Sequence, residues 1–261
     1  MPQFRGPDLT EADMWGLTPF DHMWCRREFL KLRYEGHFTP PSIAGTLVYP
    51  GNAGGFNWGG VAVDEDNQLM VATPLLMASR LALIPRDKVP KETRRYLQLG
   101  TPYAAEIRMF MSPLAMPCIE PPYGRIAVVD LQTRQVLWNK RLGTTNESGP
   151  LGMKVRVRLP MGVPVAAGSI VTKGGVIFFG GGMDRYFRAF DLRTGDELWR
   201  DYLPAPAHAT PMSYLSPKTR RQVIVITVPA ERRFGMAESD QRRPPPDPLG
   251  GHVIAYALPA D

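Results

Sequence analysis

IAVVDLQTRQVLWNKRLG, residues 126–143, decides the fold, because the chain repeats it at residues 187–204 as FRAFDLRTGDELWRDYLP. The two copies align without a gap, and Trp138 of the first matches Trp199 of the second. Each copy predicts a strand, a tight turn and a second strand. The tryptophan lies at a fixed distance past the turn, where its ring can wedge against the neighbouring unit. Repeats with one aromatic residue per unit and a period of about 60 residues predict a β-propeller built from four-stranded blades.

The turn of each copy has the pattern Asp-x-x-Thr, with Asp130 and Thr133 in the first copy and Asp191 and Thr194 in the second. Asp and Thr side chains hydrogen-bond to nearby backbone amides in turns. The second copy adds Gly195, a residue that accepts a positive φ without strain. The two stretches therefore predict hairpins of the same kind.

Other short β-type runs, bounded by Gly, Pro, Asn and Asp, occur along the chain. They lie at residues 45–50, 60–64, 68–74, 169–181, 209–215, 221–229 and 251–259. Residues 169–181 contain a Lys-Gly-Gly turn, which predicts a hairpin. Residues 85–117 are rich in proline and lack a clear period. We expect a long connection there, with a helical turn around Lys91–Leu99.

The expected number of blades follows from the repeat length. At about 60 residues per blade, residues 1–261 would hold about four blades of a propeller domain. A closed ring needs more blades, typically up to eight. The sequence therefore predicts an all-β, partial propeller. Its 27 prolines and 25 glycines, spread along the chain, favour the same class, because they indicate many short elements joined by turns.

Residues 8–36 form the one region with a helical pattern. Residues 10–13 have the spacing of a capping box, Thr18 and Pro19 form a second start signal, and Gly36 is a natural stop. The amphipathic pattern between them predicts a helical segment packed on the β-domain. A membrane-surface helix is the alternative.

Charge and hydropathy exclude several classes of protein. The net charge of +6 comes largely from dispersed arginine pairs, whereas nucleic-acid-binding proteins usually concentrate charge on one element. Solvated surface is the favoured interpretation, and attraction to an anionic membrane or ligand is the alternative. The sequence contains no window of about 18 apolar residues, the length that a helix needs to span a bilayer. Its N-terminus has no signal-peptide pattern. The chain opens like the interior of a longer protein.

The two cysteines, Cys25 and Cys118, are far apart and form no metal-binding pair. A disulfide in an oxidising compartment and two buried free thiols both fit the sequence. Among the histidines, His22, His208 and His252 lack a neighbouring acid–nucleophile pattern, which favours structural roles over catalysis.

The stretch GGFNWGG, residues 54–60, places Asn57 and Trp58 in a glycine frame at the start of a predicted strand. A core tryptophan needs no such frame. Glycines let the backbone approach a flat ligand, the amide can donate and accept hydrogen bonds, and the indole gives an apolar wall. A core tryptophan beside a turn asparagine is the alternative.

Several long segments together resemble one family. LTEADMWGLTPFD, CRREFLKLRYEGHFTPPS, GTLVYPGNAGGFNWGG, SPLAMPCIEPPYG and GGHVIAYALP are similar to the C-terminal part of membrane-bound quinoprotein dehydrogenases of the glucose/quinate/shikimate group. The Asp-x-x-Thr…Trp repeats resemble the tryptophan-docking motifs of that family. The resemblance runs almost from end to end, in the same order.

The resemblance implies an eight-bladed propeller that holds pyrroloquinoline quinone (PQQ) and a divalent cation, usually calcium. It implies oxidation of a sugar or cyclic polyol at the periplasmic face of the inner membrane, with ubiquinone as the electron acceptor. The family's catalytic base and most cation ligands belong to the first half of the propeller. No catalytic or metal-binding residue is therefore assigned to this chain, and a second chain could supply the missing half.

The resemblance also points to individual residues. Asn57 and Trp58 resemble the family's loop against the quinone, and Thr73 matches a position where glucose enzymes place an amide. Residues 230–250 depart most from the family, and their arginines, which are Arg232, Arg233, Arg242 and Arg243, suit either a carboxylated substrate or solvent. Two other functions stay open: a non-catalytic propeller scaffold, and a truncated or split gene product that is inactive alone. The sequence does not choose among glucose, quinate and shikimate.

Overall fold

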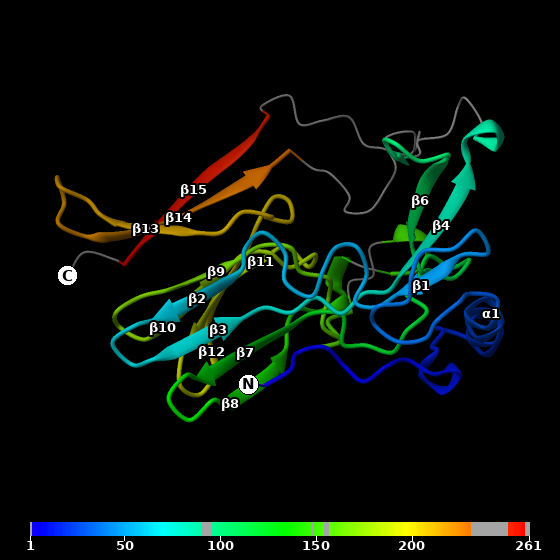
Figure 1. The fold of residues 1–261 in the computed structure, drawn as a ribbon. Helices are drawn as coiled ribbons and strands as arrows, with labels where there is room; N and C mark the ends of the chain where they lie inside the picture. Colours follow the sequence, from blue (N-terminus) through cyan, green and yellow to red (C-terminus); the bar gives the residue numbers. More distant parts are fainter. Residues whose placement is uncertain (1, 90–95, 148, 154–156, 231–249, 259–261) are drawn as a thin grey trace.

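A computed structural model describes residues 2–89, 96–147, 149–153, 157–230 and 250–258. Antiparallel sheets dominate this part of the chain (Figure 1). Three of them stand close together on one side of the molecule, and the fourth lies on the other side, next to the single α-helix of the described residues. The expected all-β class and the four-stranded sheets are confirmed.

The first copy of the repeat forms the outer half of a four-stranded sheet with the order β2-β3-β7-β8. Its strands are β2 (Val61–Asp64), β3 (Leu69–Ala72), β7 (Arg125–Asp130) and β8 (Gln135–Arg141). β7 is almost completely buried, whereas β8 is mostly exposed. β7 therefore carries the core of the sheet, as expected for a central strand between layers.

The second copy forms the outer half of a sheet with the order β9-β10-β11-β12. Its strands are β9 (Ser169–Val171), β10 (Val176–Phe179), β11 (Tyr186–Asp191) and β12 (Glu197–Tyr202). The pairing of β9 with β10 confirms the hairpin predicted from the Lys-Gly-Gly turn. The edge strands β2 and β9 contact each other, so the two sheets lie side by side like neighbouring blades (Figure 1).

The tryptophan of the first copy locks these two sheets together. Trp138 Nε1 donates a hydrogen bond of 2.9 Å to the carbonyl oxygen of Leu192 in the next sheet's turn. A Cβ on Gly195 would lie only 2.6 Å from the indole, so the ring rests directly on that turn. Glycine with φ +69° is required here for two reasons, the backbone conformation and the space taken by the ring.

The predicted turn chemistry is present in both copies. Asp130 Oδ1 accepts backbone N–H bonds from Gln132 and Thr133 at 2.8 and 2.9 Å. Asp191 Oδ1 accepts the equivalent bonds from Arg193 and Thr194 at 2.8 and 2.7 Å. These amide bonds hold the pKa of both carboxyls below the usual value.

A third sheet, with the order β13-β14-β15, ends the described chain. Its strands are β13 (Met212–Leu215), β14 (Gln222–Pro229) and β15 (Gly251–Ala257). Trp199 faces this sheet, and its ring lies 5.1 Å from that of Tyr256 on β15. Within its own sheet, the ring lies 5.9 Å from that of Phe187 on β11. Both repeat tryptophans therefore contact the next sheet, although through different partners.

The fourth sheet, β1-β4-β6-β5, corrects an expectation. Its strands are β1 (Thr46–Val48), β4 (Ser79–Pro85), β5 (Tyr96–Leu97) and β6 (Tyr103–Met109). β5 and β6 lie within residues 85–117, which we expected to be a connection, and β6 forms a long hairpin with β4. Tyr96 and Leu97 are in a strand, and the rest of the expected helical turn, apart from residues 98–99, lies outside the described residues. The hairpin stands out from the body of the molecule (Figure 1).

The helical pattern at residues 8–36 corresponds to a 3-10 turn and one α-helix, α1 (Pro19–Leu30). Thr18 caps the helix by accepting a hydrogen bond of 3.2 Å from the backbone N–H of Asp21. A disulfide joins Cys25 of α1 to Cys118, which resolves the choice that the sequence left open. Cys25 is fully buried in the main core.

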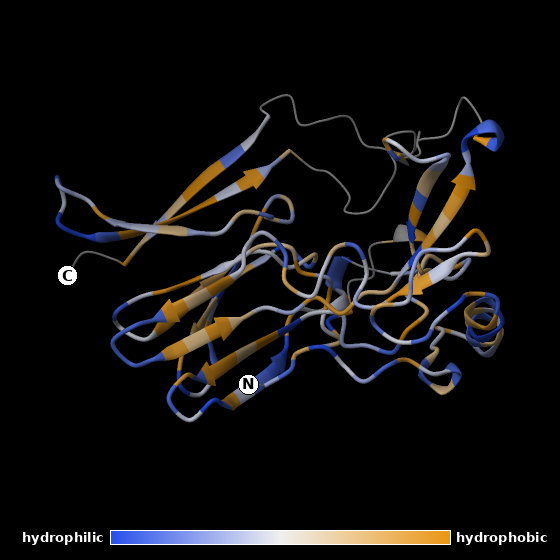
Figure 2. Ribbon diagram, viewed as in Figure 1, coloured by the Kyte–Doolittle hydropathy of each residue, from blue (hydrophilic) through white to orange (hydrophobic). Residues whose placement is uncertain are grey.

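Apolar side chains from three of the sheets and from α1 share one main core. A smaller cluster lies between the second and third sheets. Figure 2 shows the apolar residues concentrated on the inner strands of the stacked sheets. Four 3-10 segments complete the described elements, namely Glu11–Asp13, Arg86–Lys88, Thr145–Glu147 and Pro150–Gly152. In the described part of the chain, no helix has the length and apolar character needed to cross a bilayer.

Candidate functional site

The glycine frame folds into a tight loop at the start of β2. The backbone N–H of Gly60 donates to the carbonyl of Asn57 at 2.9 Å and closes a turn around Trp58. The carbonyl of Gly55 accepts a bond of 2.7 Å from Leu75, which holds the loop against the segment after β3. The loop is therefore fixed at both ends.

Gly59 and Gly168 allow two backbone segments to approach closely. A Cβ on Gly59 would lie 2.0 Å from the backbone nitrogen of Gly168, and a Cβ on Gly168 would lie 2.5 Å from the carbonyl oxygen of Gly59. Gly168 immediately precedes β9, so the contact joins the entries of the two edge strands. The sequence suggested that the glycines admit a ligand. The structure shows that at least Gly59 admits the neighbouring sheet.

Asn57 is half-buried, and both ends of its amide bond to the loop itself. Its Nδ2 donates to the carbonyl of Ala53 at 3.0 Å, and its Oδ1 accepts the backbone N–H of Trp58 at 2.8 Å. These bonds fix the orientation of the amide. One Nδ2 proton and one Oδ1 lone pair are still not committed to these two bonds, because an amide has two donors and two acceptor sites.

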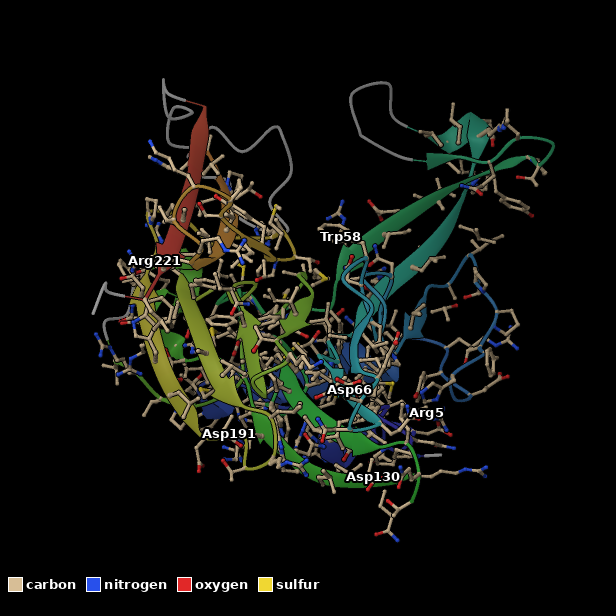
Figure 3. All side chains as sticks on the ribbon, turned by 90° about the vertical axis from the view of Figure 1, so that its left-hand side faces the viewer. Arg5, Trp58, Asp66, Asp130, Asp191 and Arg221 are labelled. Atoms are coloured by element: carbon tan, nitrogen blue, oxygen red, sulfur yellow. A yellow bond between two sulfur atoms is a disulfide. The ribbon has the colours of Figure 1, made fainter. Side chains whose placement is uncertain are left out.

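The ring of Trp58 stands out into solvent. The residue is 71% exposed, yet its Nε1 donates a hydrogen bond of 3.1 Å to the carbonyl of His208. Figure 3 shows Trp58 at the opposite end of the sheets from the turns that hold Asp66, Asp130 and Asp191. A large aromatic ring that is held by a hydrogen bond and exposed on its faces is a preformed surface for a flat ligand.

Thr73 lies one residue beyond the end of β3 and is buried. The register pairs Val61 with Ala72, which places Thr73 next to Gly60. The three predicted residues therefore gather at one end of the β2–β3 hairpin, with Asn57 and Trp58 in the loop and Thr73 beneath it.

His208 belongs to the same end of the molecule, which the sequence did not indicate. Burial lowers the pKa of its imidazole from 6.5, so the neutral form is favoured. Its carbonyl anchors the Trp58 indole, and Thr210, two residues on, has its Oγ1 only 2.6 Å from where a Cβ on Gly168 would be. In the sequence, the pair of small residues Ala167-Gly168 is the pattern that could have indicated a close contact with the segment around Thr210.

Arg188 of the second repeat copy belongs to a buried ion pair that the sequence did not reveal. Both Asp184 and Arg188 are almost fully inaccessible, and Arg188 donates two hydrogen bonds to the carboxylate. Asp184 also accepts the backbone N–H of Thr144 at 2.8 Å. The pair ties the segment after β8 to the start of β11, because the Asp184 carboxylate accepts hydrogen bonds from both Thr144 and Arg188.

A cavity of about 670 Å³ lies elsewhere, between the N-terminal segment and residues 35–40. His37 Nδ1 lies 2.7 Å from Asp8 Oδ1 at its edge. None of the predicted site residues lines this cavity. The arginines predicted at residues 230–250 lie outside the described residues. Of the other histidines, His22 is on α1 and His252 is on β15.

The residues around Trp58 fit one wall of a site for a planar quinone. The exposed indole offers an apolar face, and the fixed amide of Asn57 offers a donor and an acceptor beside it. No group of three or more metal-binding side chains is present in the described residues.

The stacked sheets, with an indole of one sheet seated on the turn of the next, define a segment of a β-propeller. The family model "PQQ: glucose/ethanol/alcohol dehydrogenase, beta-propeller domain" matches residues 1–224. The chain belongs to this family.

Named relatives support the assignment over nearly the whole chain. The quinate/shikimate dehydrogenase (quinone) of Acinetobacter baylyi is 39% identical, with 99% of this chain and 32% of that protein covered. The quinoprotein glucose dehydrogenase of Escherichia coli is 40% identical, with 97% and 32% covered. The chain thus spans about a third of the length of these relatives.

Solved structures support the fold. A europium-containing methanol dehydrogenase superimposes with a TM-score of 0.54 at 22% identity, covering 82% of this chain and 35% of that protein. The similarity of its coordinates extends the propeller assignment to most of the chain, beyond the two copies of the repeat.

Proposed function

We propose that this chain is the C-terminal part of a PQQ-dependent dehydrogenase that oxidises a sugar or cyclic polyol, such as glucose, quinate or shikimate. Residues 1–261 would form about four blades of an eight-bladed ring, with residues 8–36 as a helical segment packed on it. The preceding part of the ring, from the same or a second chain, would supply the catalytic base and most ligands of a divalent cation, calcium by preference.

One observation supports the proposal: the exposed Trp58 indole is held by a hydrogen bond at the end of the sheets opposite the turns of Asp130 and Asp191 (Figure 3). Its hydrogen bond to His208 and the backbone contact between Gly59 and Gly168 fix the ring before any ligand arrives. A preorganised wall lowers the entropy cost of binding. An indole that served only the core would not be left mostly in solvent.

Each candidate residue has a distinct role. When bound, the quinone would accept a hydride, which carries both electrons, from the carbon of the substrate's CH–OH group, and the base in the preceding part of the ring would take the hydroxyl proton. Trp58 packs against one face of the ring system and excludes water from it. Asn57 uses its uncommitted Nδ2 proton or Oδ1 lone pair to orient a quinone oxygen or carboxylate. Thr73 supports the loop from below and contributes a weaker hydrogen bond.

The location and the electron acceptor belong to the same proposal. The relatives include a quinone-linked quinate/shikimate dehydrogenase and a quinoprotein glucose dehydrogenase. We place this chain at the periplasmic face of the inner membrane, with ubiquinone as the acceptor. The Cys25–Cys118 disulfide supports an oxidising compartment.

The experiment is a titration of residues 1–261 with PQQ and calcium, followed by quenching of tryptophan fluorescence and by the absorbance of the quinone. We expect saturable binding. Trp58→Ala should weaken it about tenfold or more, since a lost stacking wall is worth more than about 1.4 kcal/mol. Thr73→Val should weaken it less. Leu99→Ala, at an exposed residue far from the loop, is the matched control.

The two alternative functions give different results. A non-catalytic scaffold would unfold cooperatively and show no saturable binding. An inactive gene fragment would lack a cooperative unfolding transition with or without the quinone. Equal binding by the parent and Trp58→Ala would remove Trp58 from the site.

A further inference from the structure

We infer that the second sheet carries a binding site for a phosphate group, either as the free ion or as a phosphate monoester. The centre of the site is the ring of Tyr186 on β11. The guanidinium carbons of Arg188, Arg200 and Arg158 lie 5.0, 5.3 and 5.5 Å from the centre of this ring. We call these four residues the Tyr186 cluster. Such a site is additional to the proposed quinone site and does not depend on it.

The strand register brings most of the cluster to one face of the sheet. Tyr186 of β11 is opposite Tyr202 of β12. Arg188 of β11 is opposite Arg200 of β12. Directly opposed residues share a face, and so do residues two apart on one strand. Arg158 comes from the connection between β8 and β9, so the cluster joins this connection to β11 and β12.

The charges of the cluster do not balance. Asp184 and Glu197 both form ion pairs with Arg188. Glu197 is also the partner of Arg200, at 3.4 Å. Arg158 forms no ion pair within the part of the chain that the structure describes. Three guanidinium groups therefore share two carboxylates, and an oxyanion can neutralise the remaining positive charge.

Glu147, on the same connection as Arg158, has partners of its own. Its carboxylate lies 3.5 Å from the guanidinium of Arg185 and accepts a hydrogen bond of 2.5 Å from the hydroxyl of Tyr202. Its charge is therefore balanced by Arg185 and does not replace an anion at the cluster.

The hydroxyl of Tyr186 is an independent indication of a ligand. Tyr186 is 5% exposed, yet its hydroxyl makes no hydrogen bond to the described residues. Buried tyrosines usually direct the O–H to a partner. The hydroxyl of Tyr186 is not sealed from solvent, in contrast to the unpaired hydroxyl of Tyr123. An anion that enters the cluster can accept its hydrogen bond.

Arg188 supports the site from inside. Its guanidinium donates to Asp184, to Glu197 and to the backbone carbonyl of Tyr186. The residue is 2% exposed. Arg188 therefore holds the tyrosine in place, and the ligand meets the two other arginines of the cluster.

The donors that remain suit a tetrahedral anion. Arg158 and Arg200 are both exposed, and guanidinium groups bind phosphate oxygens through paired N–H donors. The two guanidinium groups and the Tyr186 hydroxyl come from three different segments. Donors that approach from separate directions match the oxygens of a phosphate better than the planar oxygens of a carboxylate.

The test is isothermal titration calorimetry of residues 1–261 without quinone, at a low ionic strength kept constant with chloride salt. The ligands are inorganic phosphate, glycerol 3-phosphate and acetate. We expect saturable binding of the first two and at least about tenfold weaker binding of acetate. Tighter binding of inorganic phosphate would assign the site to the free ion. Equal or tighter binding of the ester would assign it to a phosphorylated molecule.

Variants connect the binding to the cluster. Arg158→Gln and Arg200→Gln should each weaken phosphate binding about tenfold, since each removes charge-assisted hydrogen bonds. Tyr186→Phe keeps the ring and removes only the hydroxyl, so it should weaken binding about fivefold. Arg27→Gln removes the same charge from an exposed residue of α1 and should bind like the parent. Circular dichroism shows whether each variant keeps the fold.

Several results would overturn the inference. One is the absence of saturable phosphate binding, and another is equal affinity of the parent, Arg158→Gln and Arg200→Gln. An equal loss in Arg27→Gln would show attraction to the net charge alone. Acetate that binds as tightly as phosphate would contradict a phosphate site.

Discussion

Trp138 and Gly195 hold neighbouring sheets together, because the indole of Trp138 packs where a side chain at residue 195 would be. The indole occupies the space that any Cβ at residue 195 would take, and its N–H reaches the carbonyl of Leu192. The sequence predicted both the turn and the wedge, because they depend on local chemistry. It did not predict the partner atoms, since these belong to a sheet that follows later in the chain.

Gly195→Ala should destabilise the protein by about 2 kcal/mol, because overpacking commonly costs about 1–3 kcal/mol. Gly175→Ala is the control, since Gly175 has a similar φ of +77° but no neighbouring atom within 4 Å of its ideal Cβ. The control measures the backbone strain alone, and the difference between the two variants measures the contact with Trp138. Denaturant unfolding of both variants gives the comparison. Equal losses would show that the ring does not rest on this turn in solution.

His208 makes stability depend on pH. Its pKa is lowered from 6.5 in the folded state, so the unfolded chain binds the proton more readily. The contribution of His208 to stability is therefore complete above pH 6.5 and is lost as the pH falls toward the folded-state pKa. His208→Gln keeps the carbonyl that binds Trp58 and should flatten the pH dependence in this interval. Urea midpoints of both proteins across the interval check this, and parallel curves would contradict it.

The candidate site was predictable in part at the residue scale. Asn57 and Trp58 were identified from their glycine frame, and the structure places them in one loop. Gly168, His208 and Thr210 were not identified, because they come from segments more than 100 residues away in the chain. The contact between Gly59 and Gly168 also gives the frame a packing role, which a pattern of glycines cannot distinguish from ligand access.

At the scale of elements, the hairpin of β4 and β6 is the main error of the sequence interpretation. β4 ends at Pro85, and β6 carries Glu106 and Arg108 among its apolar residues. Prolines at the ends of strands look like loop signals, and the charged side chains blur the alternating pattern. The pairing from Ser79 to Pro85 is regular all the same, and it is non-local in the sequence.

The disulfide anchors another element, α1, and its removal should be costly. A cross-link between Cys25 and Cys118 closes a loop with a sequence separation of 93 residues. Loss of such a link typically lowers stability by about 2–4 kcal/mol. We expect the reduced protein, and the double variant Cys25→Ala, Cys118→Ala, to unfold at lower denaturant concentrations. Reduction should have no effect on the double variant, which is the control for other actions of the reductant.

At the scale of the whole molecule, the third sheet leaves the edge of β15 without a neighbouring strand in the described residues. Open strand edges pair with other chains and promote association. Val253→Lys, at an exposed residue of β15, should therefore reduce self-association. Leu99→Lys adds the same charge at an exposed site away from the edge and should not. Sedimentation velocity of the three proteins at equal concentration measures the difference.

The place where β4–β6 is inserted affects the order in which the molecule forms. The strands β9 to β12 follow one another directly, whereas β3 and β7 must find each other across residues 73–124. Closing a long loop slows the pairing of its ends. We therefore expect the sheet β2-β3-β7-β8 to acquire its native pairing after the sheet β9-β10-β11-β12, although the ribosome completes it earlier. The turn between β11 and β12 would then already be formed when the Trp138 ring packs against it.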